Sequence, residues 1–152
     1  MVRKAEIGDI ETVRSLFRAY EKGLGLDLCF QGFEEELAAL PGKYAEPEGC
    51  ILLYISEGEV GGVVALKALE TEICEMKRLY VKDEFRGQKI GKTLAHAVIE
   101  EAKRKGYLLM KLDTLARLVP AVDLYRNLGF KETEAYNYNP DETVLYFEKK
   151  LN

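Results

Sequence analysis

Residues 76–94 read MKRLYVKDEFRGQKIGKTL, and this stretch passes from an apolar strand through a basic, glycine-containing loop into a helix. An aliphatic run ending at Val81 indicates the strand, and apolar residues at helical spacing from Ile90 onward indicate the helix. Amide groups in such a loop and in the first helical turn have no partner within the helix, and the helix dipole favours negative charge in front of them. The order of strand, loop and helix therefore predicts a phosphate-binding site.

Positive charge is concentrated in this stretch, although the 152-residue chain as a whole has a formal net charge of −4. Residues 77–92 contain two acidic side chains and six basic ones, which are Lys77, Arg78, Lys82, Arg86, Lys89 and Lys92. Solvated surface lysines and arginines would give the same run, but its coincidence with Gly87 and Gly91 favours a phosphate site. The overall negative charge argues against a general nucleic-acid-binding surface.

The loop resembles the signature Q/R-x-x-G-x-G/A of the GCN5-related N-acetyltransferase (GNAT) family. Arg86 and Gly91 match its first and last positions, and Lys89 replaces its middle glycine. In that family the loop holds the pyrophosphate of coenzyme A, so the resemblance implies acetyl-CoA as the cofactor. The implied cofactor-binding residues are Leu79, Tyr80, Val81, Arg86, Gly87, Gln88, Lys89, Ile90, Gly91, Lys92, Thr93 and Ala121. Lys89 can still donate its N–H in place of glycine if its φ is negative.

A second stretch, residues 121–130, reads AVDLYRNLGF and matches the family element A-x-x-L-Y-x-x-x-G-F at every fixed position. The asparagine that often precedes this element by three residues is Leu118 here. The two elements together cover about residues 50–150, and shorter segments look like a bacterial branch of the family. The resemblance implies transfer of an acetyl group to a primary amine, by direct attack in a ternary complex, with a small-molecule acceptor favoured over a protein.

Two side chains are the candidate catalytic residues. Tyr125 matches the family tyrosine that protonates or hydrogen-bonds the leaving sulfur, and a phenol is protonated at neutral pH. An amine whose pKa is about 10.4 needs a base before it can attack, and Glu75 is the candidate, with pairing to a neighbouring lysine as its alternative role. The backbone N–H of Leu79 or Val81 is expected to polarise the thioester carbonyl, and the sequence does not choose between them.

The acceptor is expected to meet the segment 24–44 and the loop 136–138, because both can border the opening of the sheet opposite the cofactor. The candidate substrate-binding residues are Asp27, Gln31, Tyr44, Arg78 and Tyr136. For Arg78 two roles are open, since it can hold a carboxylate of the acceptor or pair with an acidic side chain of the protein.

The remaining pattern predicts an α/β fold in which a mixed, mostly antiparallel central sheet is flanked by helices on both faces. The expected helices are one capped by Asp9 that closes before Gly23, then 33–40, one from Ile90 that stops at Gly106, and one from Pro120 with Gly129 as its stop. The expected strands are 50–56, 60–69, 72–81, 107–114, 130–135 and 143–151.

Length and composition fit a single N-acetyltransferase domain over residues 1–152, with a homodimer as a possible assembly. Charged residues throughout the first twenty positions leave no apolar stretch for a signal peptide or a membrane span, so we expect a cytoplasmic protein. Three widely spaced cysteines, Cys29, Cys50 and Cys74, fit reduced thiols, and a single histidine, His96, gives little support for a metal site.

Two other functions are compatible with parts of the pattern. The run from Gly91 to Thr93 ends like the P-loop of nucleotide-binding proteins, but that motif requires glycine where Arg86 stands. A non-catalytic module that binds coenzyme A or a metabolite could use the same fold. The presence of Tyr125 and Glu75 favours an enzyme over such a module.

Overall fold

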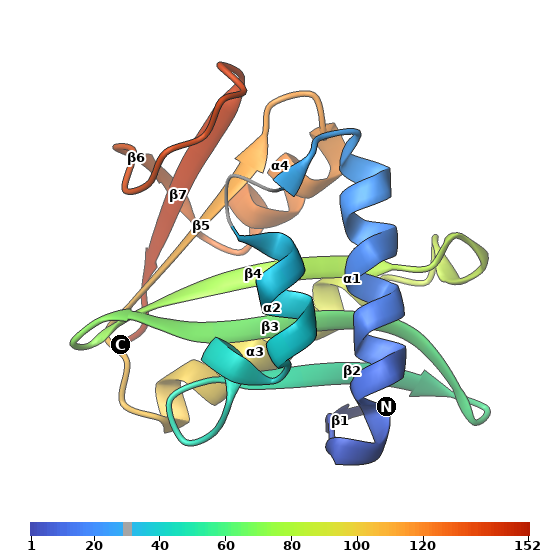
Figure 1. The fold of residues 1–152 in the computed structure, drawn as a ribbon. Helices are drawn as coiled ribbons and strands as arrows, with labels where there is room; N and C mark the ends of the chain where they lie inside the picture. The colour runs from blue at the N-terminus through green and yellow to red at the C-terminus, as the bar shows by residue number, and fades with distance from the viewer. Residues whose placement is uncertain (29–31) are drawn as a thin grey trace.

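The computed structural model describes residues 1–28 and 32–152. A seven-stranded sheet has the order β1-β2-β3-β4-β5-β7-β6, with helices on both faces (Figure 1). The strands are β1 (Val2–Lys4), β2 (Cys50–Ser56), β3 (Glu59–Glu70), β4 (Ile73–Val81), β5 (Leu109–Leu115), β6 (Lys131–Thr133) and β7 (Val144–Lys150). The helices are α1 (Ile10–Leu24), α2 (Phe33–Ala39), α3 (Ile90–Arg104) and α4 (Val119–Asn127). The predicted mixed, mostly antiparallel α/β fold is confirmed, because β4 and β5 pair in parallel and the other described pairs are antiparallel.

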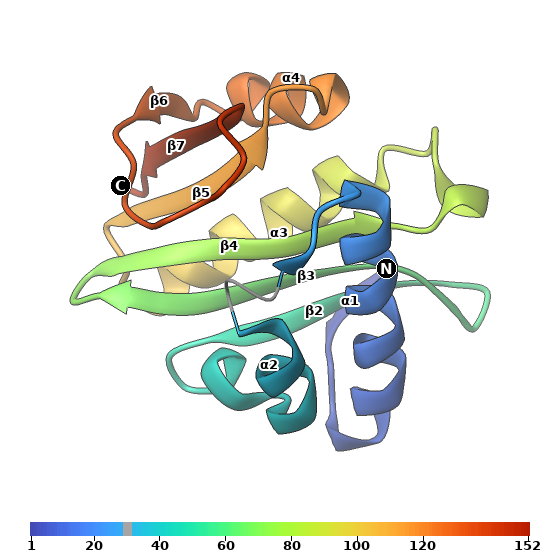
Figure 2. The same cartoon turned by 45° about the horizontal axis from the view of Figure 1, so that its top comes forward.

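The sheet is buried on both faces, with α1 and α2 on one side and α3 on the other (Figure 2). Successive side chains of a strand point to opposite faces, so Ile51 and Leu53 of β2 pack in the layer of α1 and α2. Leu52, between them, packs in the layer of α3, whose Leu94 and Val98 are fully buried. Burial on both faces explains why the central strands are nearly continuous apolar runs. Among the described helices, none has the length and apolar character needed to cross a membrane.

Apart from shifts of one or two residues at the ends of several elements, the predicted elements need correction at α1 and β1. Helix α1 continues past Gly23 to Leu24, because Gly25 is the residue that adopts the left-handed conformation at its end (φ 66°). Asp9 precedes α1 but does not cap it, since its carboxylate accepts hydrogen bonds from the Arg3 side chain (2.8 Å) and the Glu6 N–H (2.7 Å). Strand β1 was not predicted, because three residues are too few to show an alternating pattern.

Strands β4 and β5 form a wedge. Within the described residues, the two strands pair in parallel only from Ile73 to Glu75 of β4. Beyond Glu75 they separate, while β5 continues to pair with β7. On the other side of β4, Val63 of β3 faces Tyr80 and Ala65 faces Lys77, so two residues of β4 lie opposite Val64. These two residues, Arg78 and Leu79, form a β-bulge, and Arg78 has a φ of 61°. The bulge therefore lies where the two strands separate.

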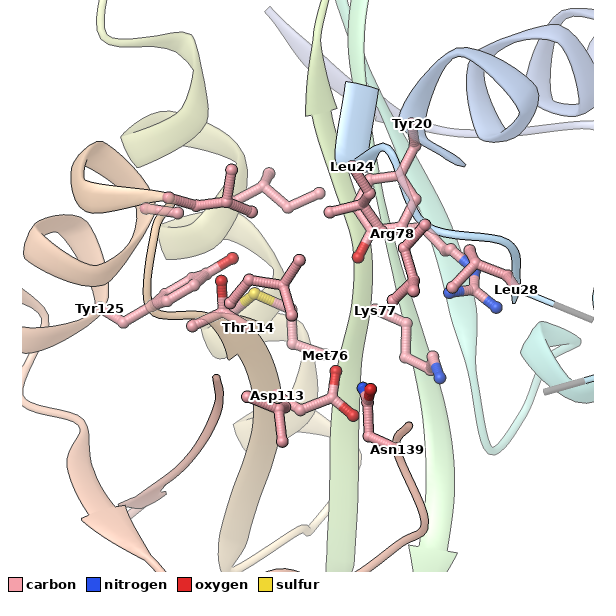
Figure 3. Close-up of a pocket in the computed structure, with 16 residues that line it drawn as sticks. Tyr20, Leu24, Leu28, Met76, Lys77, Arg78, Asp113, Thr114, Tyr125 and Asn139 are labelled. Atoms are coloured by element: carbon pink, nitrogen blue, oxygen red, sulfur yellow. The ribbon is translucent and has the colours of Figure 1, made fainter. Parts of the chain in front are cut away.

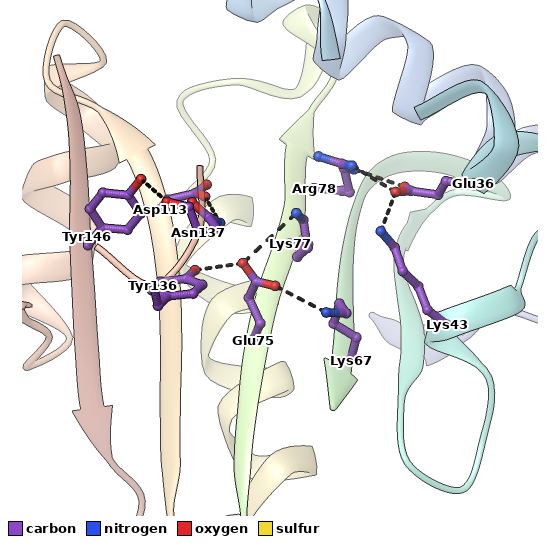
Figure 4. Close-up of polar contacts among 10 residues, drawn as sticks. All are labelled: Glu36, Lys43, Lys67, Glu75, Lys77, Arg78, Asp113, Tyr136, Asn137 and Tyr146. Atoms are coloured by element: carbon purple, nitrogen blue, oxygen red, sulfur yellow. Dashed lines mark hydrogen bonds and ion pairs between the residues drawn. The ribbon is translucent and has the colours of Figure 1, made fainter. Parts of the chain in front are cut away.

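A buried ion pair ties this bulge to α2 (Figure 4). The Arg78 guanidinium donates two hydrogen bonds to the Glu36 carboxylate, at 3.0 and 2.8 Å, and both side chains are at most 2% exposed. The Lys43 ammonium lies 2.9 Å from the same carboxylate. Burial opposes the ionised form of Glu36, but the Arg78 hydrogen bonds prevail and lower the pKa of Glu36 to about 2. The aromatic rings of Tyr20 and Phe33 flank the guanidinium at 5.6 and 5.2 Å.

The loop from β4 to α3 contains a short 3-10 turn, Asp83–Phe85, followed by two residues in the left-handed conformation. These are Gly87 (φ 85°) and Lys89 (φ 60°), which precedes the first residue of α3. The condition of a negative φ, under which Lys89 would replace the glycine, is therefore not met. The chain keeps the backbone that a glycine would adopt there, at a cost of about 1–2 kcal/mol for a residue with a Cβ.

We expect Lys89→Gly to raise the free energy of unfolding by up to about 1 kcal/mol, because glycine adopts this φ without steric cost. Gly87→Ala is the matched control, since its Cβ would meet no atom within 4 Å and the change tests the φ of 85° alone. It should lower the free energy of unfolding by a similar amount. Urea unfolding measures both. A loss of stability in Lys89→Gly equal to that in Gly87→Ala would contradict the strain at Lys89.

We expect Glu36→Gln to lower the free energy of unfolding at pH 7 by about 3 kcal/mol, because it leaves Arg78 buried without its charge partner. The folded pKa of Glu36 is about 2 and the reference value is 4.5, so its stabilisation is present above pH 4.5 and lost as the pH falls toward 2. The difference between wild type and variant should therefore shrink over that range in urea unfolding. Glu34 is in α2 like Glu36, and it forms an exposed ion pair with Arg18 of α1. Glu34→Gln should therefore change the free energy of unfolding by at most about 0.5 kcal/mol. A difference that stays constant with pH would argue against the ion pair as its source.

Candidate functional site

A cavity of about 70 Å³ opens where β4 and β5 separate (Figure 3). Its wall comes from the end of α1 and the residues after it, from β4 and β5, from α4, and from the segment around Asn139. Among the described residues, the polar and charged side chains on the wall are Tyr20, Lys77, Arg78, Asp113, Thr114, Tyr125 and Asn139. The volume suits several water molecules or the reacting ends of two ligands.

Tyr125 lies on this wall, with its hydroxyl directed into the cavity (Figure 3). Its ring packs edge-on against Phe130 at a centroid distance of 5.9 Å and lies tilted against Phe147 at 6.5 Å. These contacts explain why the residues around Tyr125 follow the fixed A-x-x-L-Y-x-x-x-G-F spacing, since Phe130 closes the same element. Burial raises the pKa of Tyr125 well above its ordinary value, so the phenol stays protonated and can donate a hydrogen bond.

The bulge separates the two candidate amides on β4. Leu79 borders the cavity, whereas Val81 does not, and Val81 lies opposite Gly62 in the regular part of the sheet. The carbonyl of Val81 accepts a hydrogen bond from the Arg86 side chain at 3.3 Å, which links the strand end to the loop. The geometry therefore favours Leu79 as the residue whose amide meets a ligand in the wedge.

The predicted phosphate loop lies at the beginning of α3, at the end of the wedge where Val81 emerges (Figure 2). Arg86, Gly87, Gln88, Lys89, Lys92 and Thr93 are exposed. Ile90 is buried in the core, so only its backbone can contribute, and Tyr80 packs in the layer of α1. A Cβ on Gly91 would reach only ordinary contact, 3.8 Å from Val81 and Leu124, so the protein itself does not require glycine there. The absence of a side chain instead leaves the helix end open to a ligand, which fits a diphosphate.

Glu75 is buried beside the cavity but is not part of its wall. The Tyr136 hydroxyl donates a hydrogen bond of 2.6 Å to its carboxylate, and the ammonium groups of Lys67 and Lys77 lie at 3.6 and 4.0 Å (Figure 4). Burial, with the adjacent Glu75 charge, raises the pKa of Tyr136 far above its ordinary value. The carboxylate therefore has the lysine partners that the sequence left open, and it reaches the cavity only through an intervening group.

Lys77 and Asp113 are wall residues that the sequence reasoning did not select. Asp113 accepts a hydrogen bond of 2.9 Å from the Asn137 side chain, and burial lowers the pKa of Lys77 to about 8 while Glu75 opposes that shift. A signal existed for Asp113, because a carboxylate near the end of an apolar strand is unusual. For Lys77 no such signal existed, because in the sequence it is one of six basic residues in a run whose other members after Arg78 are at the surface or partly exposed.

The candidate acceptor residues are only partly brought together. Arg78 borders the cavity but pairs with Glu36, so the second of its two open roles is the one found. Tyr44 is buried against Phe17 and does not border the cavity, so we withdraw it from the acceptor site. Asp27 is exposed and lies off the wall, between Leu26 and Leu28, which are on it. Gln31 lies outside the described residues, and Tyr136 contacts Glu75.

Comparison with known sequences agrees with this geometry. A family model described as the acetyltransferase (GNAT) family matches residues 11–130. An N-acetyltransferase of Schizosaccharomyces pombe is 40% identical over 146 residues, covering 95% of this chain and 90% of that protein. N-acetylaspartate synthetase of Danio rerio is 36% identical over 106 residues, covering 66% of this chain and 38% of that protein. The expected likeness to a bacterial branch is not borne out, since close relatives are eukaryotic.

Solved structures share the fold. A GNAT-family acetyltransferase from Staphylococcus aureus Mu50 has a TM-score of 0.83 at 19% identity, over 100% of this chain and 99% of that one. The PaiA N-acetyltransferase of Thermoplasma acidophilum, crystallised with coenzyme A, has a TM-score of 0.76 at 24% identity over 99% and 98%. The P-loop alternative is excluded by the 3-10 turn and the antiparallel neighbour of β4. The chain belongs to the GNAT family of acetyltransferases.

Proposed function

We propose that this protein transfers the acetyl group of acetyl-CoA directly to the primary amine of a small molecule, with both substrates bound at once. The single observation that carries the proposal is one cavity, in the wedge between β4 and β5, that is bordered by the bulge at Leu79, the Tyr125 hydroxyl and the Asp113 carboxylate. The likeness to N-acetylaspartate synthetase, whose name specifies a small acceptor, and the narrow cavity support a small molecule.

When bound, acetyl-CoA supplies the acyl group as a thioester. The exposed loop from Arg86 to Lys89 and the first turn of α3 would hold its diphosphate, because their amides and the helix dipole favour an anion. Ala121 and Leu79 border the wedge and would flank the pantetheine arm. The Leu79 amide would hydrogen-bond the thioester oxygen and stabilise the charge that develops there.

Tyr125 is the proposed acid. Its hydroxyl is protonated at neutral pH and faces the cavity, so it can hydrogen-bond or protonate the departing sulfur. Before or during its attack on the thioester, the acceptor amine must lose a proton to a carboxylate or to water. Asp113 borders the cavity, and Glu75, the residue selected from the sequence, lies behind Tyr136 and Lys77. We propose Asp113 as the group that meets the ammonium, and Glu75 as a base acting through a relay.

A reducing compartment such as the cytoplasm is the proposed location. Cys50 and Cys74 are free thiols buried in the core, which is typical of proteins kept under reducing conditions.

Isothermal calorimetry should detect binding of acetyl-CoA, and an amine-dependent release of free thiol should follow. Tyr125→Phe should lower kcat by about 10²-fold with an unchanged Kd for acetyl-CoA, because only the proton donor is removed. Tyr107→Phe is the matched control, since its hydroxyl donates to the Glu48 carbonyl away from the cavity, and it should keep the wild-type kcat. Absence of binding heat at millimolar acetyl-CoA would disprove the proposed function, whereas an unchanged kcat in Tyr125→Phe would remove only that residue from the mechanism.

The two carboxylates can be separated by substitution. We expect Asp113→Asn to lower kcat/KM for the amine more than Glu75→Gln, because only Asp113 borders the cavity. The difference should narrow as the pH rises and the free amine becomes more abundant, since a neutral amine needs less help from a base. The pH profile of kcat/KM between pH 6 and 10 measures both. A larger loss in Glu75→Gln would return the primary role to Glu75.

A further inference from the structure

The charged side chains on the cavity wall are Lys77, Arg78 and Asp113, so the wall presents both signs of charge. Arg78 is committed to the protein, because Glu36 accepts two of its hydrogen bonds and two aromatic rings flank its guanidinium. Lys77 comes one residue earlier on β4 and, because of the bulge, lies on the same face of the sheet (Figures 3 and 4). Lys77 is thus a second cation on this wall.

Lys77 is held at this position in a buried state. Its side chain is 8% exposed, and its ammonium lies 4.0 Å from the Glu75 carboxylate. Burial lowers its pKa to about 8, and the nearby Glu75 charge only partly offsets this. An additional anion at the cavity would stabilise the charged lysine, because a buried ammonium gains from each opposite charge placed close to it.

We propose that Lys77 binds a carboxylate of the acceptor, and that the acceptor is therefore a free amino acid. Resting on the proposed function, this assignment places the acceptor amine beside Asp113 and its carboxylate beside Lys77, so the two charges of the ligand match the two charges of the wall. A carboxylate is the usual partner of such an ammonium, through a charge-assisted hydrogen bond.

Other amine acceptors fit the wall less well. A polyamine would bring a second positive charge toward Lys77, and like charges at close range are unfavourable. The side-chain amine of a protein lysine carries no carboxylate of its own to occupy that end. The presence of Lys77 and Asp113 on one wall therefore selects for a zwitterion rather than for an amine in general.

The test compares each standard amino acid with its primary carboxamide as acceptor, using release of free thiol from acetyl-CoA by the wild-type protein. The carboxamide keeps the amine and the side chain and removes the negative charge, and comparison at a pH where both amines are largely unprotonated offsets the lower basicity of its amine. We expect the best amino acid to exceed its carboxamide by at least about tenfold in kcat/KM. Equal rates, faster reaction of the carboxamides, or reaction of simple amines alone would overturn the inference.

Substitution at the lysine then locates the effect. Lys77→Met should bring the ratio of amino acid to carboxamide close to one, and Lys77→Arg should retain part of it. Lys67→Met is the matched control, because Lys67 lies 3.6 Å from the same Glu75 carboxylate but off the cavity wall, and it should preserve the ratio. A ratio that persists in Lys77→Met would overturn the assignment to Lys77, and the comparison in the wild type stands if that variant does not fold.

The two levels of proposal fail separately. If acetyl-CoA binds and carboxamides or simple amines release thiol while amino acids do not, the inference fails and the proposed function stands. If acetyl-CoA gives no heat, the proposed function fails. If it binds and no acceptor of the panel releases thiol, the amino-acid assignment is overturned.

Discussion

The buried ion pair between Arg78 and Glu36 is the constraint on which the site depends. Removing two charges from water costs several kcal/mol per ion, and the pair recovers this only through good geometry and additional partners. Here the geometry is a two-point contact, and Lys43 and two aromatic rings supply the additional partners. Because Arg78 lies in the bulge and Glu36 in α2, one interaction fixes the bulge of β4 relative to the helix layer of α1 and α2.

Backbone strain is found at the bulge and at the beginning of α3. Among the described residues other than glycine, Glu57, Glu72, Arg78 and Lys89 have φ in the left-handed region. Glu57 and Glu72 are in the tight turns that connect successive strands, where this conformation is ordinary. Arg78 and Lys89 instead bracket the segment from the bulge to the beginning of α3. Strain of this kind persists only where surrounding structure enforces it, and it concentrates at ligand-binding sites.

The sequence was sufficient for the fold and for the place of the basic loop between β4 and α3, because those depend on local patterns. Strand β2 was predicted at its observed limits, since an apolar run between turns needs no tertiary information. The left-handed φ of Lys89 was missed because propensity favours a negative φ for lysine, and the requirements of the loop override it. The residues that would contact the acceptor could not be predicted from local patterns. Tyr44 was selected but is buried away from the cavity, and Asp113 was not selected but borders it, because which polar side chain faces a cavity depends on packing between segments far apart in the chain.

The cysteines provide a last argument for direct transfer. A mechanism through an acetylated enzyme needs a reactive thiolate or another nucleophile on the cavity wall. Of the described cysteines, Cys50 and Cys74 are both in the core layer of α3, and burial raises the pKa of each to about 12. A thiol in that state is almost entirely protonated at neutral pH and is a poor nucleophile. Neither borders the cavity that contains the Tyr125 hydroxyl, so neither of these cysteines is placed to form a covalent acetyl-enzyme intermediate. In the proposed direct transfer the amine is held beside the thioester when it attacks, so the charges on the wall can decide which amine is used.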